Sequence, residues 1–303
     1  MIGILLLLSP VQFPGQWLFI CWLLPLFMIK PKPVPVGVVK LTVLDVGQGL
    51  SVLIQTRSHT LLYDTGMGFP DGYNMGSVVI LPYLRHEHIS HLDQLMISHG
   101  DADHAGGAST ILSFFPSTPV LTSVPERFPH HQASHCMAGQ SWVWDNVNFD
   151  VLYPLHEAKK SNDNSCVIHI TAGSQSALLT GDIEKPSEQT LVLKDPQDLS
   201  ATVLIAPHHG SKTSSSQIFL DKVRPQYVVF STGYFNRYHF PSPLVESRYA
   251  NLNAKIYNTA YNGAVVFTFG ETQTMHVEAY REMHGHFWQF MMVPSKGLSS
   301  EEK

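Results

Sequence analysis

The chain has 303 residues, of which 44% are hydrophobic and only 14% are charged. This length accommodates one large domain or two small ones, and the low charge fits a globular domain joined to an apolar segment. The net charge of −5 argues against a free-standing nucleic-acid binder that works through a basic surface. It does not exclude a nuclease, because two bound divalent ions would reverse the sign of the field locally.

The three cysteines, Cys21, Cys136 and Cys166, are too few for a disulfide framework. Cys21 lies in the apolar N-terminal region, which leaves one pair in the rest of the chain. A Cys136–Cys166 bridge would form in an oxidising compartment. We expect free structural thiols, with the bridge as the alternative.

Residues 1–29 are almost uncharged and contain two apolar runs, Ile2 to Leu8 and Trp17 to Ile29. Each run is shorter than the roughly 20 residues that span a bilayer as a helix. A signal peptide is not favoured, because a basic n-region and a small-residue cleavage site are both missing. A core helix is a further alternative, although soluble helices show a polar face. Residues 30–37 alternate proline with apolar residues and are interpreted as an extended linker.

From Val38 onward, short apolar strands alternate with segments of helical period. We expect strands at residues 39–44, 51–55, 60–63, 92–98, 120–121, 141–153, 166–182, 202–206, 226–231, 255–258 and 263–268. We expect helices at residues 74–84, 107–115, 184–194, 216–223 and 243–250. Residues 124–140 are rich in Pro, His and Gln and are expected to form a mobile loop over the site. Periodicity alone gives an α/β domain at residues 38–278, followed by a tail at 279–303.

Four metal-capable side chains fall within six residues, His99 to His104, at the spacing H-x-D-x-D-H. An apolar run, Leu92 to Ile97, leads into them, and Gly106-Gly107 opens an expected helix. A strand that runs into a tight loop at the carboxyl end of a sheet is where α/β folds place their chemistry. Imidazole and carboxylate together bind divalent cations such as zinc, manganese or iron. A polar loop merely rich in His and Asp is the alternative, but this spacing favours a metal site.

The motif and its following Gly-Gly resemble the metallo-β-lactamase signature H-x-H-x-D-H, with the second His replaced by Asp101. That replacement is similar to the ComEC group, the DNA-internalisation channel proteins of natural competence. Further matches occur in the family's order at Leu44 to Gly49, Tyr63 to Gly66, Leu179 to Asp182 and Ala206 to Ser211. Together they cover roughly residues 38–270. The resemblance implies the four-layer αββα sandwich of metallo-β-lactamases, preceded here by a short hydrophobic membrane segment.

The resemblance also implies a place for the N-terminal residues. In ComEC proteins this hydrolase domain follows a long multi-helix membrane part, so residues 1–29 are interpreted as the end of that part, in the inner (cell) membrane. The chain would then be a fragment or a shortened gene product. Lys30 and Lys32 favour a cytoplasmic domain by the positive-inside tendency. DNA must meet the nuclease before crossing, however, so we expect a periplasmic or extracellular domain.

The resemblance assigns metal-binding roles residue by residue. His99 and Asp101 match the ligands of a first metal ion, and Asp103 and His104 match those of a second. Asp182, on the turn after an apolar strand, matches the carboxylate that bridges both ions. Either Asp103 or Asp182 would orient the nucleophile.

Later matches complete the expected site. His209, favoured over His208, matches the last ligand of the second ion. His208 would then contact the substrate phosphate as a catalytic residue or support the ligands from behind. Asp64 matches a structural acid that buttresses the metal loop. The third histidine of the usual first site has no counterpart; Asn164 matches the family's own Asn there, and Asp163 is a weaker candidate.

Asp101 in place of an imidazole makes the first site richer in oxygen ligands. Hard sites of this kind favour manganese or magnesium over zinc. We therefore expect two divalent metal ions, with Mn²⁺ first and Mg²⁺ or Zn²⁺ as alternatives.

Small hydroxyl residues follow the histidine pair, from Ser211 to Ser216, with Lys212 adding charge. Hydroxyls and free backbone N–H groups ahead of a helix form a natural phosphate cradle. A plain helix cap needs one such residue, and here there are five. The expected contacts to the substrate phosphate are Ser211, Lys212, Thr213 and Ser214.

These inferences converge on a metal-dependent phosphodiesterase, in the family's terms the nuclease domain of a DNA-uptake channel in natural transformation. It would act on a single strand or a duplex end and degrade the DNA strand that is not imported. Its partners would be the membrane channel part of the same family protein and competence DNA receptor proteins. Two alternatives remain: a hydrolase of a small phosphodiester or lactone on the same scaffold, and a non-catalytic module that guides DNA.

Overall fold

The computed structural model describes residues 20–21, 33–156, 161–194 and 199–284. Most of the expected membrane segment at 1–29, and part of the linker at 30–37, lie outside these ranges. Within the described ranges, no helix is long and apolar enough to cross a membrane. From Val34 onward the chain forms one unit built on two β-sheets.

Eight strands form the first sheet, in the order β15-β14-β1-β2-β3-β4-β5-β6. The strands β1 to β3 are antiparallel neighbours, whereas β4, β5 and β6 continue beside β3 in parallel. Parallel neighbours end at the same edge, so the loops after β3, β4 and β5 meet there. The strands are β1 (Val38–Val43), β2 (Val52–Gln55), β3 (Thr60–Tyr63), β4 (Gln94–Ile97), β5 (Val120–Thr122), β6 (Ala133–His135), β14 (Val265–Gly270) and β15 (Gln273–Ala279).

Seven strands form the second sheet, in the order β13-β12-β11-β10-β9-β8-β7. The last four in the chain, β10 to β13, run parallel and therefore carry their following loops at one edge. The strands are β7 (Ser141–Trp144), β8 (Val147–Tyr153), β9 (Val167–Ala172), β10 (Gln175–Leu179), β11 (Val203–Ile205), β12 (Tyr227–Phe230) and β13 (Lys255–Asn258).

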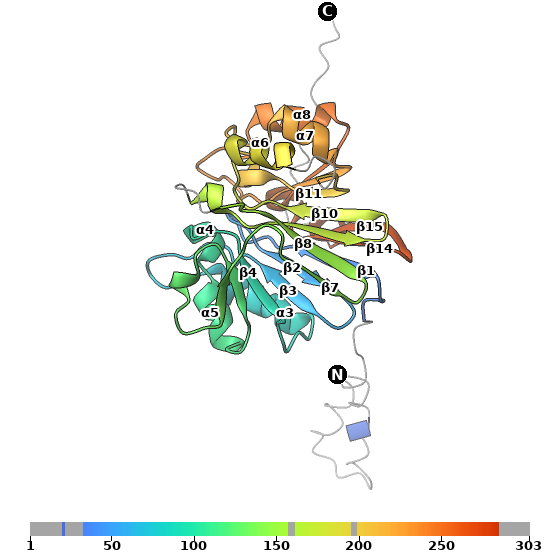
Figure 1. The fold of residues 1–303 in the computed structure, drawn as a ribbon. Helices are drawn as coiled ribbons and strands as arrows, with labels where there is room; N and C mark the ends of the chain where they lie inside the picture. The colour runs from blue at the N-terminus through green and yellow to red at the C-terminus, as the bar shows by residue number, and fades with distance from the viewer. Residues whose placement is uncertain (1–19, 22–32, 157–160, 195–198, 285–303) are drawn as a thin grey trace, which may run out of the picture. The chain divides into compact units, whose positions relative to one another are not determined.

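Helices cover the outer face of each sheet (Figure 1). On the first sheet lie α3 (Leu81–His86), preceded by a π-helix at Gly76–Ile80, and α5 (Ala108–Phe114). On the second lie α6 (Lys185–Lys194), α7 (Gln217–Val223) and α8 (Pro243–Asn251). Short helices occupy loops: α4 (Ala102–Ala105), α9 (Thr259–Asn262) and α10 (Tyr280–Met283), with 3₁₀ turns at Pro125–Arg127, Asn162–Asn164 and Pro207–Gly210.

Three buried clusters correspond to the three interfaces between these layers. Along β3, Leu61 and Tyr63 point into the cluster between the sheets, while Leu62 packs with the helices outside. This is the two-residue period of a strand that is buried on both faces. A third cluster joins the second sheet to its helices, with Phe219 and Tyr249 among its largest members. One cluster between the sheets and one between each sheet and its helices are the pattern of the predicted two-sheet α/β fold.

The expectation of free thiols was wrong, because Cys136 and Cys166 form a disulfide. Both residues are fully buried in the cluster between the sheets. The expected mobile loop at 124–140 was also wrong in part, since β6 pairs in parallel with β5 and the Cys136 N–H donates to the carbonyl of Thr122. The Cα atoms of Cys136 and Cys166 lie 6.1 Å apart, within the ordinary range for a disulfide.

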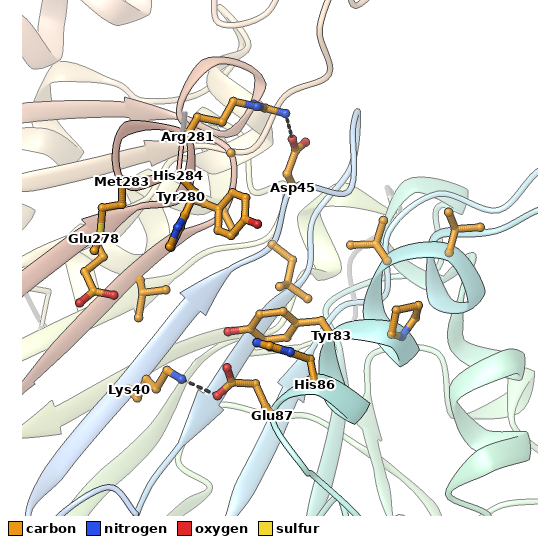
Figure 2. Close-up of a pocket in the computed structure, with 17 residues that line it drawn as sticks. Lys40, Asp45, Tyr83, His86, Glu87, Glu278, Tyr280, Arg281, Met283 and His284 are labelled. Atoms are coloured by element: carbon orange, nitrogen blue, oxygen red, sulfur yellow. Dashed lines mark hydrogen bonds and ion pairs between the residues drawn. The ribbon is translucent and has the colours of Figure 1, made fainter. Parts of the chain in front are cut away.

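The C-terminal strand β15 was not predicted, and with α10 it carries the described fold past the expected boundary at residue 278. Together with α3 it borders a pocket of about 670 Å³ (Figure 2). Arg281 reaches Asp45 at 2.6 Å and Lys40 reaches Glu87 at 2.5 Å across this pocket. Asp45 also accepts a hydrogen bond from the Gly47 N–H. Asp45 therefore caps a turn and anchors the C-terminal segment.

Reduction of the disulfide is expected to lower the free energy of unfolding by about 3 to 4 kcal/mol, from the entropy of closing a loop of its length. The two cysteines are 30 residues apart in sequence. Urea unfolding with and without reductant measures the change, and the double variant Cys136→Ala/Cys166→Ala should show no reductant effect. The unfolded, unreduced wild type should titrate one thiol, that of Cys21; three thiols would contradict the bridge.

Candidate metal centre

Loops from both sheets bring four of the predicted ligands together. Asp103 and His104 follow β4, Asp182 follows β10, and His209 follows β11. Their ligand atoms all lie within 4.8 Å of one another. His104 Nε2 is 3.1 Å from Asp182 Oδ1 and 3.3 Å from His209 Nε2. Two imidazoles and two carboxylates facing one point are a donor set suited to a divalent cation.

A second pair of predicted ligands lies beside this group. His99 Nε2 is 3.6 Å from Asp101 Oδ2, and the ring of His99 lies 4.3 Å from the ring of His104. Among the described residues, Nε2 of His99 is buried and has no hydrogen-bond partner. Oδ1 of Asp182 is likewise buried and accepts no hydrogen bond of good geometry from that part of the chain. Unsatisfied buried polar atoms are costly, so the residues fit bound cations that both atoms would contact.

Hydrogen bonds from behind fix the two imidazoles of the four-residue group. His104 Nδ1 lies 2.7 Å from Asp64 Oδ2, and both side chains are fully buried. His209 Nδ1 lies 2.8 Å from the carbonyl oxygen of Ser231. A ring that donates from Nδ1 has its Nε2 lone pair free for a metal ion. Asp64 was expected behind the metal loop and lies there; Ser231 was not singled out from the sequence.

Two serine side chains hydrogen-bond to the other candidate metal ligands, Asp182, His99 and Asp101. Neither serine was singled out from the sequence. Ser165 Oγ accepts a hydrogen bond from the Asp182 N–H at 3.0 Å and lies 3.3 Å from His99 Nδ1. Ser161 Oγ donates to Asp101 Oδ1 at 2.8 Å. The only sequence signal for both was their position on either side of the Asn162–Asn164 turn.

That turn contains the two residues considered for the missing third histidine. Asn164 closes the turn directly before Ser165. Asp163 accepts a hydrogen bond from Ser187 Oγ at 2.7 Å, which ties the turn to α6. Neither residue belongs to the four-residue donor group among the described residues.

The backbone around the site explains its glycines and its strained histidines. A Cβ atom on Gly106 would collide with the backbone of Gly68, so the metal loop packs against its neighbour only with glycine there. His208 and His209 have φ values of +50° and +54°, a left-handed conformation that is unfavourable for residues with a side chain. Consecutive strained residues at one loop are typical of functional sites.

His208 lies at the open side of the donor group. Its Nε2 is 3.8 Å from Asp182 Oδ2, and its Nδ1 is 3.6 Å from Glu184 Oε1. The side chain is 21% exposed, whereas His104 is fully buried. His208 can therefore reach a molecule bound at the group, and Glu184, which the sequence did not single out, can orient its ring.

The predicted phosphate cradle divides into buried and exposed members. Ser211 and Ser214 are buried, and the Ser214 hydroxyl donates to the Pro207 carbonyl at 2.8 Å. Lys212 and Thr213 are exposed. These two side chains are the members of the cradle that a substrate can reach directly.

Electrostatics make the group attractive to positive charge. Burial opposes ionisation of Asp182, but the nearby His104 and His209 outweigh it and hold the pKa of that carboxyl well below its usual range. Burial also opposes ionisation of Asp103, yet a hydrogen bond with His209 and the charge of His104 lower its pKa. Against desolvation, the carboxylates of Asp182 and Asp64 raise the pKa of His104 well above its usual value. The carboxylates of Asp103 and Asp182 are thus ionised, as cation ligands must be, and a cation bound by His104 would take the place of its proton.

Comparison with known proteins gives the class to which this fold and donor set belong. Residues 44–234 match the Metallo-beta-lactamase superfamily, and the chain belongs to that superfamily. The solved structure of the metallo-beta-lactamase fold protein YhfI from Bacillus subtilis aligns with a TM-score of 0.50 at 14% identity, covering 73% of this chain and 96% of that chain. That likeness concerns the fold alone, and it confirms the predicted two-sheet α/β architecture.

The curated relatives of this chain include a competence protein and a recombination protein. The chain is 38% identical over 263 residues to Competence protein ComA of Neisseria gonorrhoeae, covering 86% of this chain and 36% of that protein. It is 38% identical over 253 residues to Recombination protein 2 of Haemophilus influenzae, covering 83% of this chain and 31% of that protein. The chain spans about a third of the length of these relatives, and the resemblance stated from the motifs is confirmed.

Asp64→Asn is expected to weaken metal binding about 10- to 100-fold, because an amide cannot accept from His104 and Ser98 as the carboxylate does. Asp64 accepts from the N–H and the hydroxyl of Ser98 as well as facing His104. Competition with a chelator dye measures the affinity. Asp45→Asn, the same change at the Arg281 ion pair, is the matched control and should bind metal like the wild type. Equal affinity in both variants would contradict the role of Asp64.

Proposed function

We propose that this domain is a metal-dependent phosphodiesterase that hydrolyses DNA as the nuclease of a DNA-uptake channel. The observation that carries the proposal is the pair of adjacent donor sets, in which His99 Nε2 and Asp182 Oδ1 are buried without hydrogen bonds from any residue that the structure describes. Adjacent sites of this kind suit two-metal hydrolysis of phosphodiesters. The names of the relatives, one a competence protein and one a recombination protein, support DNA as the substrate.

In this proposal the donors divide between two divalent ions, Mn²⁺ first, with Mg²⁺ or Zn²⁺ as alternatives. His99 and Asp101 would hold the first ion, Asp103, His104 and His209 would hold the second, and Asp182 would be available to both. When bound, the ions supply Lewis acidity and an activated water for attack on phosphorus. Asp64, Ser165 and Ser231 keep the ligands in place through the hydrogen bonds described above, and Asn164 supports the turn that carries Ser165.

The exposed side of the site handles the substrate. His208 faces a phosphate oxygen with its Nε2, while its Nδ1 lies 3.3 Å from the Thr213 hydroxyl and 3.6 Å from Glu184 Oε1. Lys212 and Thr213 contact the neighbouring phosphate, Lys212 by charge and Thr213 by its hydroxyl. Ser211 and Ser214 act indirectly, by fixing the backbone from which those two side chains extend.

The relatives and the disulfide support a proposal for the setting of the reaction. The domain degrades the strand that is not imported, next to a membrane channel part and competence DNA receptor proteins. Buried disulfides persist in oxidising compartments, so Cys136–Cys166 supports a periplasmic or extracellular position for the domain.

Asp103→Ala or His104→Ala should reduce hydrolysis of a fluorescent DNA strand to less than about a tenth of the wild-type rate, because each change removes a ligand. Asp221→Ala is the control, since Asp221 lies exposed on α7, where its carboxylate accepts a hydrogen bond from the neighbouring Gln217. Thermal melting establishes that each variant is folded. A folded ligand variant with a rate above that limit would contradict the assignment, and a wild type without bound metal would favour a non-catalytic module.

The order in which different metal ions restore activity tests whether Asp101 is a ligand of the first site. Activity of the chelated protein should be restored best by Mn²⁺, less by Mg²⁺ and poorly by Zn²⁺, because Asp101 supplies oxygen where zinc prefers nitrogen. Asp101→His should move this order toward zinc. Full activity with zinc alone, unchanged by Asp101→His, would show that Asp101 is not a ligand.

A further inference from the structure

Exposed aromatic rings gather on one loop beside the metal centre, residues 233–240, which we call the aromatic loop. Within it Phe235 is 86% exposed, Tyr234 49% and Tyr238 47%. The loop has the sequence Gly-Tyr-Phe-Asn-Arg-Tyr-His-Phe and contains no aliphatic side chain. Large rings are usually buried on at least one side, so several exposed rings in one loop indicate a surface that meets a partner.

Local hydrogen bonds hold this loop in shape. The Asn236 amide donates to the carbonyls of Gly233 and Phe240 at 3.1 and 2.7 Å, and its oxygen accepts from the Phe240 N–H at 2.8 Å. Gly233 packs against the backbone of Gln48, where a Cβ would come within 2.8 Å of the Gln48 nitrogen. The rings are therefore presented by a fixed backbone, which reduces the entropy lost when a partner binds.

A continuous series of ring contacts joins this loop to the donor group. His208 lies edge-on to Phe240 with centroids 5.9 Å apart, and Phe240 stacks with Tyr238 at 5.4 Å and 19°. The Arg237 guanidinium lies 4.8 Å above the Tyr238 ring. A molecule held on the aromatic loop is thus placed next to the residue that would contact the reacting phosphate.

We propose that the aromatic loop is a stacking platform for unpaired bases of the DNA strand that enters the metal centre; this rests on the proposed function. Flat faces are common to all four bases, so stacking binds a strand without regard to sequence. The net charge of −5 gives little attraction for phosphates away from the metal centre and Lys212, so stacking and Arg237 would add affinity for the strand beyond the site. The ring contacts that lead from this loop to His208 favour a strand that continues into the metal centre over a lipid surface or a protein partner.

Binding of two fluorescent strands to the full chain tests the platform. One is an oligothymidylate and the other an abasic strand of equal length and charge, both with phosphorothioate linkages that slow hydrolysis. The wild type should bind the base-bearing strand about tenfold more tightly or better, as one or more stacked bases would give. Phe235→Ala should lose most of this preference, because Phe235 is the most exposed ring of the loop, while Phe235→Tyr, which keeps an aromatic ring, should retain it.

Phe114→Ala is the matched control, because Phe114 is 53% exposed under Arg85 on another surface. It should leave the preference unchanged. Equal affinity of the wild type for both strands would overturn the proposal. So would a Phe235→Ala variant that keeps the preference but no longer sediments with phosphatidylglycerol vesicles, since the loop would then bind membrane. This experiment measures binding and not hydrolysis. A chain that binds the base-bearing strand more tightly but never cleaves DNA would therefore contradict the proposed function and leave the stacking platform supported.

Discussion

The buried contact between Asp64 and His104 is the constraint on which the centre depends. A carboxylate without exposure to water is costly unless its oxygens are fully hydrogen-bonded. Asp64 meets this condition through the backbone and hydroxyl of Ser98 and through His104 Nδ1. Because Asp64 follows β3 and Ser98 follows β4, the same contacts tie two strand ends together and aim the imidazole at the other ligands.

The site is complete only because two sheets pack together. The first sheet supplies His99 to His104, and the second supplies Asp182 and His209. Near the site the sheets are joined by the Cys136–Cys166 disulfide and by the Tyr63 hydroxyl, which donates to the Cys166 carbonyl at 2.6 Å. Packing between the sheets therefore sets the distances between the candidate metal ligands. The buried apolar cluster between the sheets thus positions these ligands as well as stabilising the fold.

The features that could be predicted from the sequence are those formed by residues close together in the chain. The motif at His99 to His104 lies within one loop, and the strands feeding it show a clear apolar period. Ser165, Ser231 and Glu184 were missed because each meets the site only through tertiary packing. The disulfide was judged wrongly for the same reason. Strand β15, with the sequence Gln-Thr-Met-His-Val-Glu-Ala, was missed because an exposed edge strand carries too little apolar signal.

The central claim is that two adjacent donor sets each hold a divalent ion. Anomalous diffraction from crystals of the full chain grown with Mn²⁺ tests it most directly. Two peaks are predicted, one bounded by Asp103, His104 and His209 and one beside His99 and Asp101, with Asp182 between them. A map with no peak at the four-residue group, in protein whose manganese content is otherwise at least one ion per chain, would contradict the account.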